Sequence, residues 1–189
     1  MTTFLTKVSD SVQELRTVRS MTTLALLMAM ALVLNLFVSI QITPTLKLGF
    51  GFLATAAMGM LYGPFWAGVA AGLVDIFQFV LKPTGQFFPG FTITAMLGGV
   101  FYGFFLYKNK TSLPRIILVK TLINVLLHLL LNSYWLTILY DQAFWAQIPA
   151  RIVKNVAMLP IEILLLKALL PQLVKITQLI QRSHANESK

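Results

Sequence analysis

The stretch YGPFWAGVAAGLVDIFQFVL, residues 62–81, contains a single charged side chain, Asp75. Its length suits a membrane-spanning helix, which needs roughly 20 mostly apolar residues. A turn signal, Gly63–Pro64, stands near its start, and Pro64 is well placed for the first turn of a helix. The stretch therefore predicts a helix that crosses a bilayer and holds one carboxylate inside it.

The composition of the whole chain extends this prediction. Of its 189 residues 57% are hydrophobic and only 11% are charged, and the mean hydropathy is +0.79. A soluble globular protein carries about 25% charged residues, so a water-soluble single domain is excluded. The chain can hold about six spans if the connections are short. That leaves no room for a large enzyme domain outside the membrane.

We therefore expect an all-α integral membrane protein, a bundle of six transmembrane helices. Residues 1–17 form an amphipathic segment expected to lie in the membrane interface as a short helix. The bundle is expected to occupy residues 18–182, and a polar tail residues 183–189. The expected spans follow the apolar runs of the sequence and are 18–40, 48–62, 65–81, 91–107, 113–139 and 148–181.

Helix breakers separate these spans. QITPTLKL, residues 41–48, contains a proline, and KPTGQFFPG, residues 82–90, contains prolines and glycines. Both are predicted to be loops. Pro160 and Pro171 are expected to interrupt the sixth span.

The charges predict the orientation. The chain carries 15 Lys and Arg against 6 Asp and Glu, a formal net charge of +9. The basic residues gather at helix ends on one side of the predicted bundle, which is typical of cytoplasmic loops. We interpret them as placing both termini in the cytoplasm, and not as a nucleic-acid site. The chain has no cysteine and two histidines, so Cys-ligated zinc and iron–sulfur clusters are excluded, and we expect no metal and no cofactor.

Small residues predict how the helices pack. Glycines recur at four-residue spacing in the second to fourth spans, which stacks them on one helix face and lets another backbone approach closely. We interpret these pairs as internal packing. Ala25 and Ala29 have the same spacing on the first span, near the cytoplasmic side, where a partner protein could dock.

Polar residues inside the hydrocarbon are costly and indicate function. Asp75 is the clearest case, and Gln78 and Lys82 fall near the same helix face, three and seven residues later. These side chains predict a polar strip that opens outward. The alternative is a carboxylate neutralised by a neighbouring cation.

The fifth span carries a longer polar stripe. Lys120, Asn124, His128 and Asn132 recur every four residues, so this face is expected to look into the bundle. We expect Lys120 to form a buried ion pair with Glu162 and not to act in catalysis. His128 is expected to be a core histidine, since no second ligand set accompanies it.

The outer ends of several spans supply a candidate ligand site. Residues 85–92 place three aromatic rings between glycines and a proline, an arrangement that suits a rigid aromatic pocket, although an interfacial aromatic belt is the alternative. The candidate cavity suits a planar aromatic ligand with N–H donors at one end and carboxylates at the other. The predicted substrate-binding residues are Asp75, Gln78, Phe87, Phe88, Pro89, Phe91, Thr92, Asn132, Trp135, Arg151 and Lys154.

Enzyme motifs offer no competing interpretation. The sequence contains no HExxH, no GxSxG and no GxxxxGK[ST]. We therefore expect no enzymatic activity, and active transport would need an ATPase supplied by another subunit.

Longer stretches of the sequence resemble a known family, the folate-specific S components of energy-coupling factor (ECF) vitamin transporters. FFPGFT after a GPxxxG…D helix is the most specific part. An LN-x-x-WL pattern falls on Leu131, Asn132, Trp135 and Leu136. The stretches that carry the resemblance are LKLGFGFL (46–53), YGPFWAGVAAGLVDIF (62–77), FFPGFTITAMLGGVFYG (87–103), LLLNSYWL (129–136) and RIVKNVAMLPIEI (151–163).

The resemblance implies a six-helix bundle in a bacterial cell membrane that captures folate from outside with high affinity. It implies three partner subunits, a transmembrane coupling protein and two cytosolic ATPases that drive inward delivery. It further implies docking through an AxxxA pattern, matched by Ala25 and Ala29, and loops at 41–48 and 82–90 that gate the cavity. Two alternatives stay open, namely an S component for riboflavin or thiamin and a small intramembrane enzyme acting on a lipid.

Overall fold

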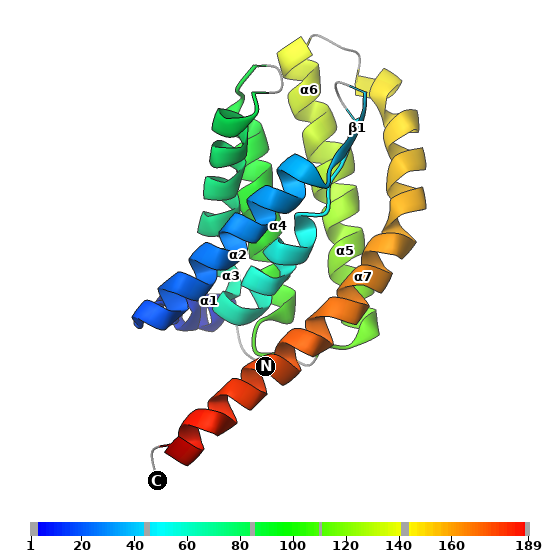
Figure 1. The fold of residues 1–189 in the computed structure, drawn as a ribbon. Coiled ribbons are helices and arrows are strands. Elements are labelled where there is room, and N and C mark those ends of the chain that lie inside the picture. Colours follow the sequence, from blue (N-terminus) through cyan, green and yellow to red (C-terminus); the bar gives the residue numbers. More distant parts are fainter. Residues whose placement is uncertain (1–3, 44–45, 84–85, 110, 141–143, 188–189) are drawn as a thin grey trace.

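The computed structural model describes residues 4–43, 46–83, 86–109, 111–140 and 144–187. It is a bundle of helices with one short hairpin (Figure 1). In chain order the elements are α1 (Phe4–Gln13), α2 (Val18–Phe37), β1 (Ile40–Thr43), β2 (Leu46–Leu48), α3 (Phe52–Leu81), α4 (Pro89–Leu106), α5 (Leu113–Leu122), the π-helical segment η1 (Ile123–Leu131), α6 (Asn132–Tyr140) and α7 (Phe144–Glu187).

Five helices in the described part of the chain are long and apolar enough to cross a membrane, which confirms a multi-pass helical protein. The second and third expected spans, however, form one element, the 30-residue helix α3. Its direction changes at Gly63, where φ is 77° and ψ is −175°. The five candidate spans are Val18–Phe37, Phe52–Leu81, Pro89–Leu106, Leu113–Leu139 and Arg151–Leu173.

The kink in α3 is held by a side chain from α1. Gly63 adopts a positive φ that an L-residue with a Cβ rarely takes, and Pro64 has no N–H to donate. In a regular helix the carbonyl of Tyr62 would accept from the N–H of Trp66. Instead Ser11 Oγ donates to the Tyr62 carbonyl at 2.5 Å and accepts from the Trp66 N–H at 3.4 Å. The hydroxyl therefore bridges the interrupted hydrogen bond.

The polar side of α1 faces the bundle. Lys7 and Ser11 are buried, whereas Val12 is 48% exposed. Tyr107, just after α4, donates its hydroxyl to Glu14 Oε1 at 2.5 Å, and burial together with this carboxylate raises the pKa of Tyr107. The sequence correctly predicts a short helix here, but the residues that fasten it to the bundle are the polar ones.

The glycine pairs pack α3 against α4, as expected from their spacing. A Cβ at Gly59 would lie 2.7 Å from the backbone nitrogen of Gly103, and one at Gly99 would overlap the carbonyl of Ala67. A Cβ at Gly68 would lie 2.8 Å from a methyl group of Val100. These glycines therefore let the two helices approach closely enough for backbone contact.

The connection after α2 is a β-hairpin and not the predicted loop. Strands β1 and β2 pair antiparallel, with Ile40 opposite Leu48 and Gln41 opposite Lys47. Two β-rich runs separated by two residues are typical of a hairpin. The predicted loop at 41–48 therefore contains a short antiparallel pair of strands within an otherwise helical bundle, and Pro44 lies outside the described residues.

The last two expected spans are continuous helices. The fifth is α5, η1 and α6 in succession, with a π-helical middle. The sixth, α7, continues through Pro160 and Pro171 to Glu187, so the expected interruptions are wrong and most of the predicted tail, 183–189, is helical. Figure 1 shows that α7 bends along its length, as helices containing proline do.

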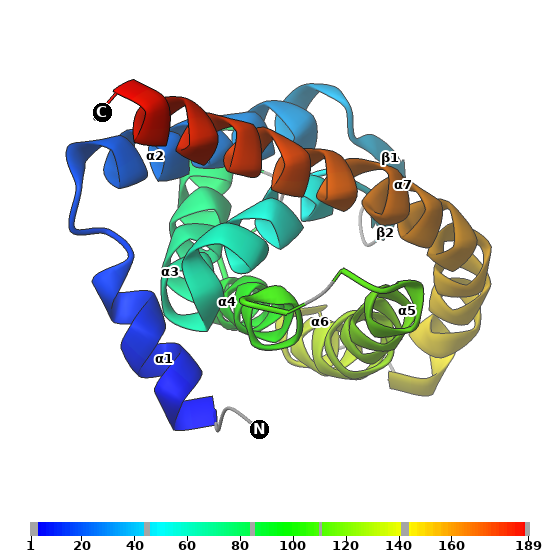
Figure 2. The same ribbon diagram turned by 90° about the horizontal axis from the view of Figure 1, so that it is seen from below.

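The connections between helices and the ends of the chain lie at two opposite ends of the bundle (Figure 1). The turn between α4 and α5 and the C-terminal part of α7 lie at the same end as α1, while the hairpin and the start of α7 lie at the other (Figures 1 and 2). The main apolar core joins α3, α4, α5, η1 and α7 and includes Leu106, Ile116, Val119, Leu166 and Leu170.

Candidate ligand-binding cavity

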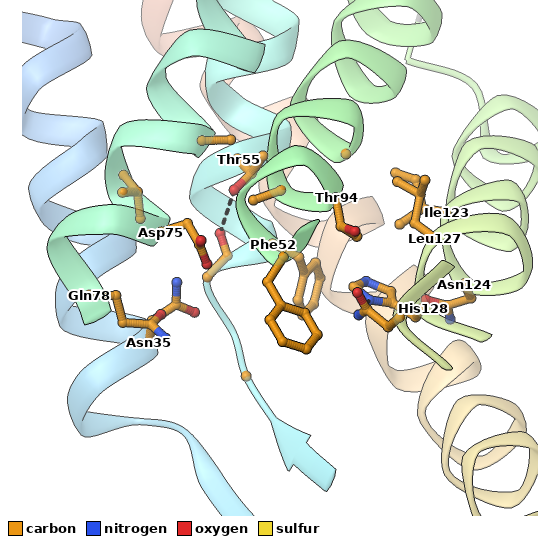
Figure 3. A pocket seen from close by; sticks show the side chains of 18 of the residues that line it. Asn35, Phe52, Thr55, Asp75, Gln78, Thr94, Ile123, Asn124, Leu127 and His128 are labelled. Carbon is orange, nitrogen blue, oxygen red and sulfur yellow. Dashed lines mark hydrogen bonds between the residues drawn. The ribbon is translucent and has the colours of Figure 1, made fainter. Parts of the chain in front are cut away.

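A cavity of about 440 Å³ lies among α3, α4, η1 and α7, within the usual size range of small-molecule sites. Figure 3 shows it from close by. Its polar lining residues are Asn35, Thr55, Asp75, Gln78, Gln86, Thr94, Tyr102, Lys120, Asn124, His128, Asn132, Arg151, Lys154, Asn155 and Glu162, and its phenylalanines are Phe52, Phe79, Phe87, Phe88 and Phe91.

Most of the side chains predicted from the sequence as a ligand site line this cavity. Three do not, namely Pro89, Thr92 and Trp135. Thr92 donates a hydrogen bond to Asp75, the ring of Trp135 packs against Phe88, and Pro89 begins α4. Lys82, at the C-terminal end of α3, is exposed and lies outside the lining. The predicted residues that line the cavity are Asp75, Gln78, Phe87, Phe88, Phe91, Asn132, Arg151 and Lys154.

Asp75 is positioned by a neighbouring helix. Thr92 Oγ1, in the first turn of α4, donates a hydrogen bond to Asp75 Oδ2 at 2.8 Å. Figure 3 shows Asp75, Gln78 and Asn35 on the same side of the cavity, opposite Asn124 and His128. The charge-assisted bond from Thr92 fixes the carboxylate while leaving acceptor capacity on it, since an ionised carboxylate has about four lone-pair sites.

The predicted aromatic loop forms a packed cluster at the start of α4. The ring of Phe88 lies 5.5 Å from that of Trp135 and 6.0 Å from that of Phe91, between centroids. Trp135 Nε1 donates to Thr94 Oγ1 at 3.1 Å. A Cβ at Gly90 would overlap Phe88 and lie 2.6 Å from Trp135. Trp135 therefore holds the aromatic wall from behind and does not face the cavity.

The ion pair expected between the fifth and sixth spans is confirmed. Lys120 Nζ lies 3.1 Å from Glu162 Oε1, and Asn124 Nδ2 donates to Glu162 Oε2 at 3.0 Å. The ammonium also lies 4.2 Å from the ring centroid of Phe52. Lys120 is 1% exposed and Glu162 12% exposed, so each compensates the other's burial. This pair is expected to be structural, yet both of its residues also line the cavity.

Arg151 reaches the cavity wall through the backbone of η1. Its guanidinium donates to the carbonyl of His128 at 3.1 Å and its side chain is buried. Lys154, one turn later on α7, lines the same wall. The Nδ2 atom of Asn132 lies 3.4 Å from His128 Nδ1. This wall therefore carries two cations, an imidazole and an amide.

The π-helical geometry of η1 keeps the polar stripe together. In an α-helix, residues four apart drift steadily around the axis, which would carry Asn132 away from Lys120. A π-helix has more residues per turn because its hydrogen bonds span five residues, so across η1 the drift is reversed. All four stripe residues consequently line the cavity. The four-residue spacing predicts the shared face but not the π-helix that maintains it.

Two buried polar atoms on the cavity wall have no hydrogen-bond partner among the described residues, Tyr102 Oη and Asn132 Oδ1. Buried polar groups are nearly always satisfied by protein, water or ligand. Tyr102 is not among the predicted site residues. Tyr102 could have been predicted from the helical spacing of Phe91, Ala95, Gly98 and Tyr102, because these residues form one stripe of α4 that lines the cavity.

The wall formed by α2 and the start of α3 is not among the predicted site residues. Asn35, near the end of α2, lies so close to Gly51 that a Cβ there would overlap its amide. Phe52 and Thr55 follow in the first turn of α3 and line the same wall. Asn35 could have been predicted from the sequence because it is an isolated amide near the end of an apolar span. Ala25 and Ala29, by contrast, are exposed on α2 and lie outside the cavity lining.

The chain is similar to a described transporter family. The family model "ECF transporter, substrate-specific component" matches residues 19–170. A folate transporter FolT of Clostridium novyi is 38% identical over 147 residues, covering 78% of this chain and 85% of that protein. A folate transporter FolT of Streptococcus mutans is 30% identical over 164 residues, covering 83% of this chain and 88% of that protein.

A solved structure has a similar fold. The crystal structure of FolT bound with folic acid aligns with a TM-score of 0.76 at 33% sequence identity. The alignment covers 80% of this chain and 92% of that chain. The similarity therefore includes most of the bundle that surrounds the cavity.

Proposed function

The chain belongs to the substrate-specific components of ECF transporters, and we propose that it binds folate in the cavity described above. Relatives that match most of its length are folate transporters, and the similar solved structure holds folic acid. The proposed role is capture and delivery of the vitamin. ATP hydrolysis is assigned to partner subunits and not to this chain.

The observation that carries this proposal is the chemical polarity of the cavity. Asp75 and Gln78 lie on one wall (Figure 3), while Arg151 and Lys154 come from α7, where Arg151 bonds to the carbonyl of His128 on the opposite wall. Folate has N–H donors on its pterin ring and carboxylates on its glutamate. We assign the pterin to the Asp75 wall, where a carboxylate accepts paired N–H groups, and the glutamate to the cations.

The remaining predicted contacts follow from this placement. Phe87, Phe88 and Phe91 line the cavity as flat apolar surfaces for the aromatic parts of folate. The unpaired atoms Tyr102 Oη and Asn132 Oδ1 are assigned to hydrogen bonds with the ligand. Thr92 and Trp135 support Asp75 and Phe88 from outside the cavity, and Pro89 begins the helix that carries Phe91.

A titration of the purified chain in detergent tests the proposal. We expect saturable binding of one folate per chain, with no measurable binding of riboflavin or thiamin at the same concentrations. Binding of a flavin without binding of folate would contradict the assignment. Conversion of a lipid substrate by the purified chain alone would instead favour the intramembrane enzyme.

We further propose that the chain is oriented with both termini in the cytoplasm of a bacterial cell, and that the two arms of α3 serve as two of six segments. In support, α1 and the C-terminal part of α7 lie at one end of the bundle (Figure 1). Exposed cations at this end include Arg16 between α1 and α2, Arg19 at the start of α2 and Lys108 just after α4. Such an excess is typical of cytoplasmic segments.

Cysteine labelling checks this orientation, because the natural chain contains no cysteine. Lys82 and Arg16 are both exposed, at the hairpin end and the α1 end of the bundle. A membrane-impermeant maleimide added to intact cells is expected to label the Lys82→Cys variant and not the Arg16→Cys variant. Permeabilised cells should label both. Labelling of Arg16→Cys alone in intact cells would invert the proposed topology.

We propose that a transmembrane coupling protein and two cytosolic ATPases complete the transporter, with docking through α2. Ala25 and Ala29 are exposed on that helix, one turn apart, and small residues at this spacing let another helix approach closely. They also lie outside the cavity lining. Docking and ligand binding are therefore separable.

Replacing both alanines with leucine tests the docking surface. We expect the Ala25→Leu/Ala29→Leu variant to bind folate as the natural chain does but to lose co-purification with the coupling protein. The matched control is Leu26→Ala, which changes an exposed residue between them (71% exposed) without adding bulk. Survival of the complex in the double variant would place docking elsewhere.

A further inference from the structure

A second hollow, of about 530 Å³, lies where α1, the end of α4 and the start of α5 meet. It shares no lining residue with the ligand cavity. Figure 2 views this end of the bundle and shows α1 beside α3 and α4. We call this hollow the α1–α5 groove.

The lining of the α1–α5 groove includes two cationic side chains. Lys7 and Arg115 line it, and Asn109 and Ser112 add polar groups; none of the described lining residues is acidic. Lys7 is only 7% exposed, and its ammonium donates to the carbonyl of Phe104 at 2.8 Å. Burial and the nearby charge of Arg115 lower the pKa of Lys7. An anion between the two cations would offset both effects.

The nearby acidic residues of α1 contact other groups. Asp10 forms an ion pair with Lys108 at 3.0 Å, and Glu14 accepts from the hydroxyl of Tyr107. Neither residue lines the α1–α5 groove. The charged side chains among the lining residues of the groove are therefore Lys7 and Arg115.

Apolar residues also line the α1–α5 groove, and two of them, Pro114 and Leu118, belong to a candidate membrane span. Phe105, Pro114 and Leu118 line it, and Leu118 is 50% exposed on α5. The segment Leu113–Leu139 is long and apolar enough to cross a membrane. A cationic recess joined to an apolar wall on such a helix matches a molecule with an anionic head and a hydrocarbon tail.

We propose that the α1–α5 groove binds an anionic phospholipid, with its phosphate between Lys7 and Arg115 and an acyl chain along Leu118. The apolar wall distinguishes this occupant from a soluble phosphate, which would gain nothing from Leu118. The bound lipid fastens α1 to α5 at the membrane surface. This site is independent of the ligand in the central cavity.

Native mass spectrometry of the full chain in mild detergent tests the proposal, with equimolar phosphatidylglycerol and phosphatidylcholine as the probes. We expect preferential retention of phosphatidylglycerol. Lys7→Gln and Arg115→Gln are each expected to reduce that retention about fivefold, as removal of one interfacial cation does. The charge-preserving variants Lys7→Arg and Arg115→Lys should retain most of the bound lipid.

Arg16→Gln is the matched control, because Arg16 is an exposed cation just after α1 that does not line the α1–α5 groove. It should leave retention unchanged. If Lys7→Gln lowers the thermal stability of the protein, then lipid retention in the Arg115→Gln variant is the measurement that tests the proposal. Equal retention of the two lipids, unchanged retention in Arg115→Gln, or displacement of the lipid by millimolar inorganic phosphate would each overturn the proposal.

Discussion

Replacing Asp75 with asparagine is expected to weaken folate binding by about 1.5–3 kcal/mol, or roughly ten- to a hundredfold in Kd. The substitution keeps the shape of the side chain but exchanges a charged acceptor for an amide that carries two donors. Thr92 Oγ1 already donates to this carboxylate at 2.8 Å, so the side chain is held in place to accept N–H groups from a ligand. Isothermal titration in detergent measures the change.

A matched acid-to-amide variant separates ligand contact from general charge loss. Asp10 pairs with Lys108 on the outside of the bundle and lies outside the cavity lining. Asp10→Asn should therefore leave the Kd for folate unchanged. An Asp75→Asn variant with natural thermal stability and unchanged affinity would remove Asp75 from the site.

Replacing Glu162 with leucine is expected to destabilise the fold by about 3–5 kcal/mol, because it leaves a buried ammonium without its counter-charge. Lys120 is 1% exposed, so water cannot compensate, and the ring of Phe52 at 4.2 Å supplies only part of the lost interaction. The free energy of unfolding can be measured by SDS titration in mixed micelles.

A double variant decides whether the ion pair is the cause. Lys120→Met/Glu162→Leu removes both charges and should recover most of the lost stability, since well-packed apolar residues replace buried pairs at little cost. Lys167→Met, at an exposed position on the same helix, should change stability by less than about 0.5 kcal/mol. If the double variant is as unstable as Glu162→Leu, then packing and not charge explains the loss.

The sequence predicts the polar residues of the site because a charged side chain inside a membrane span is costly and is kept mainly for an ion pair or a binding site. Asp75, Arg151 and Lys154 are exceptions to an apolar background, and all three line the cavity. The same argument finds the Lys120–Glu162 pair. The free-energy cost of burying a charge, however, does not tell whether the residue forms a structural ion pair or lines a cavity. Lys120 and Glu162 do both.

The overlooked residues are those whose polarity is ordinary in a membrane helix. Tyr102 and Asn35 become informative only when the structure shows which helix faces meet. Trp135 is the converse case, because its position beside Asn132 suggests a cavity residue. In the structure its N–H donates to Thr94 and its ring packs behind Phe88.

The lengths of the apolar runs predict most of the membrane-spanning helices correctly. The sequence predicts less well whether a glycine or proline ends a helix or only bends it. Gly63–Pro64 is correctly read as a break in the helix, but a glycine at φ 77° allows a kink with no intervening loop. Pro160 and Pro171 are read as breaks and are absorbed within α7. Whether a glycine or proline ends a helix, kinks it or is accommodated within it depends on tertiary packing, which the positions of these residues in the sequence do not show.

The bridge from Ser11 to the kink of α3 has a consequence for biogenesis. Its hydroxyl and the Tyr62 carbonyl are separated by 51 residues, so the serine leaves the ribosome well before its partners. The bridge can form only after the chain has been synthesised through Trp66, because both of its backbone partners, the Tyr62 carbonyl and the Trp66 N–H, lie in α3. Its formation therefore requires about the first third of the chain and joins the first helix to the kink of α3.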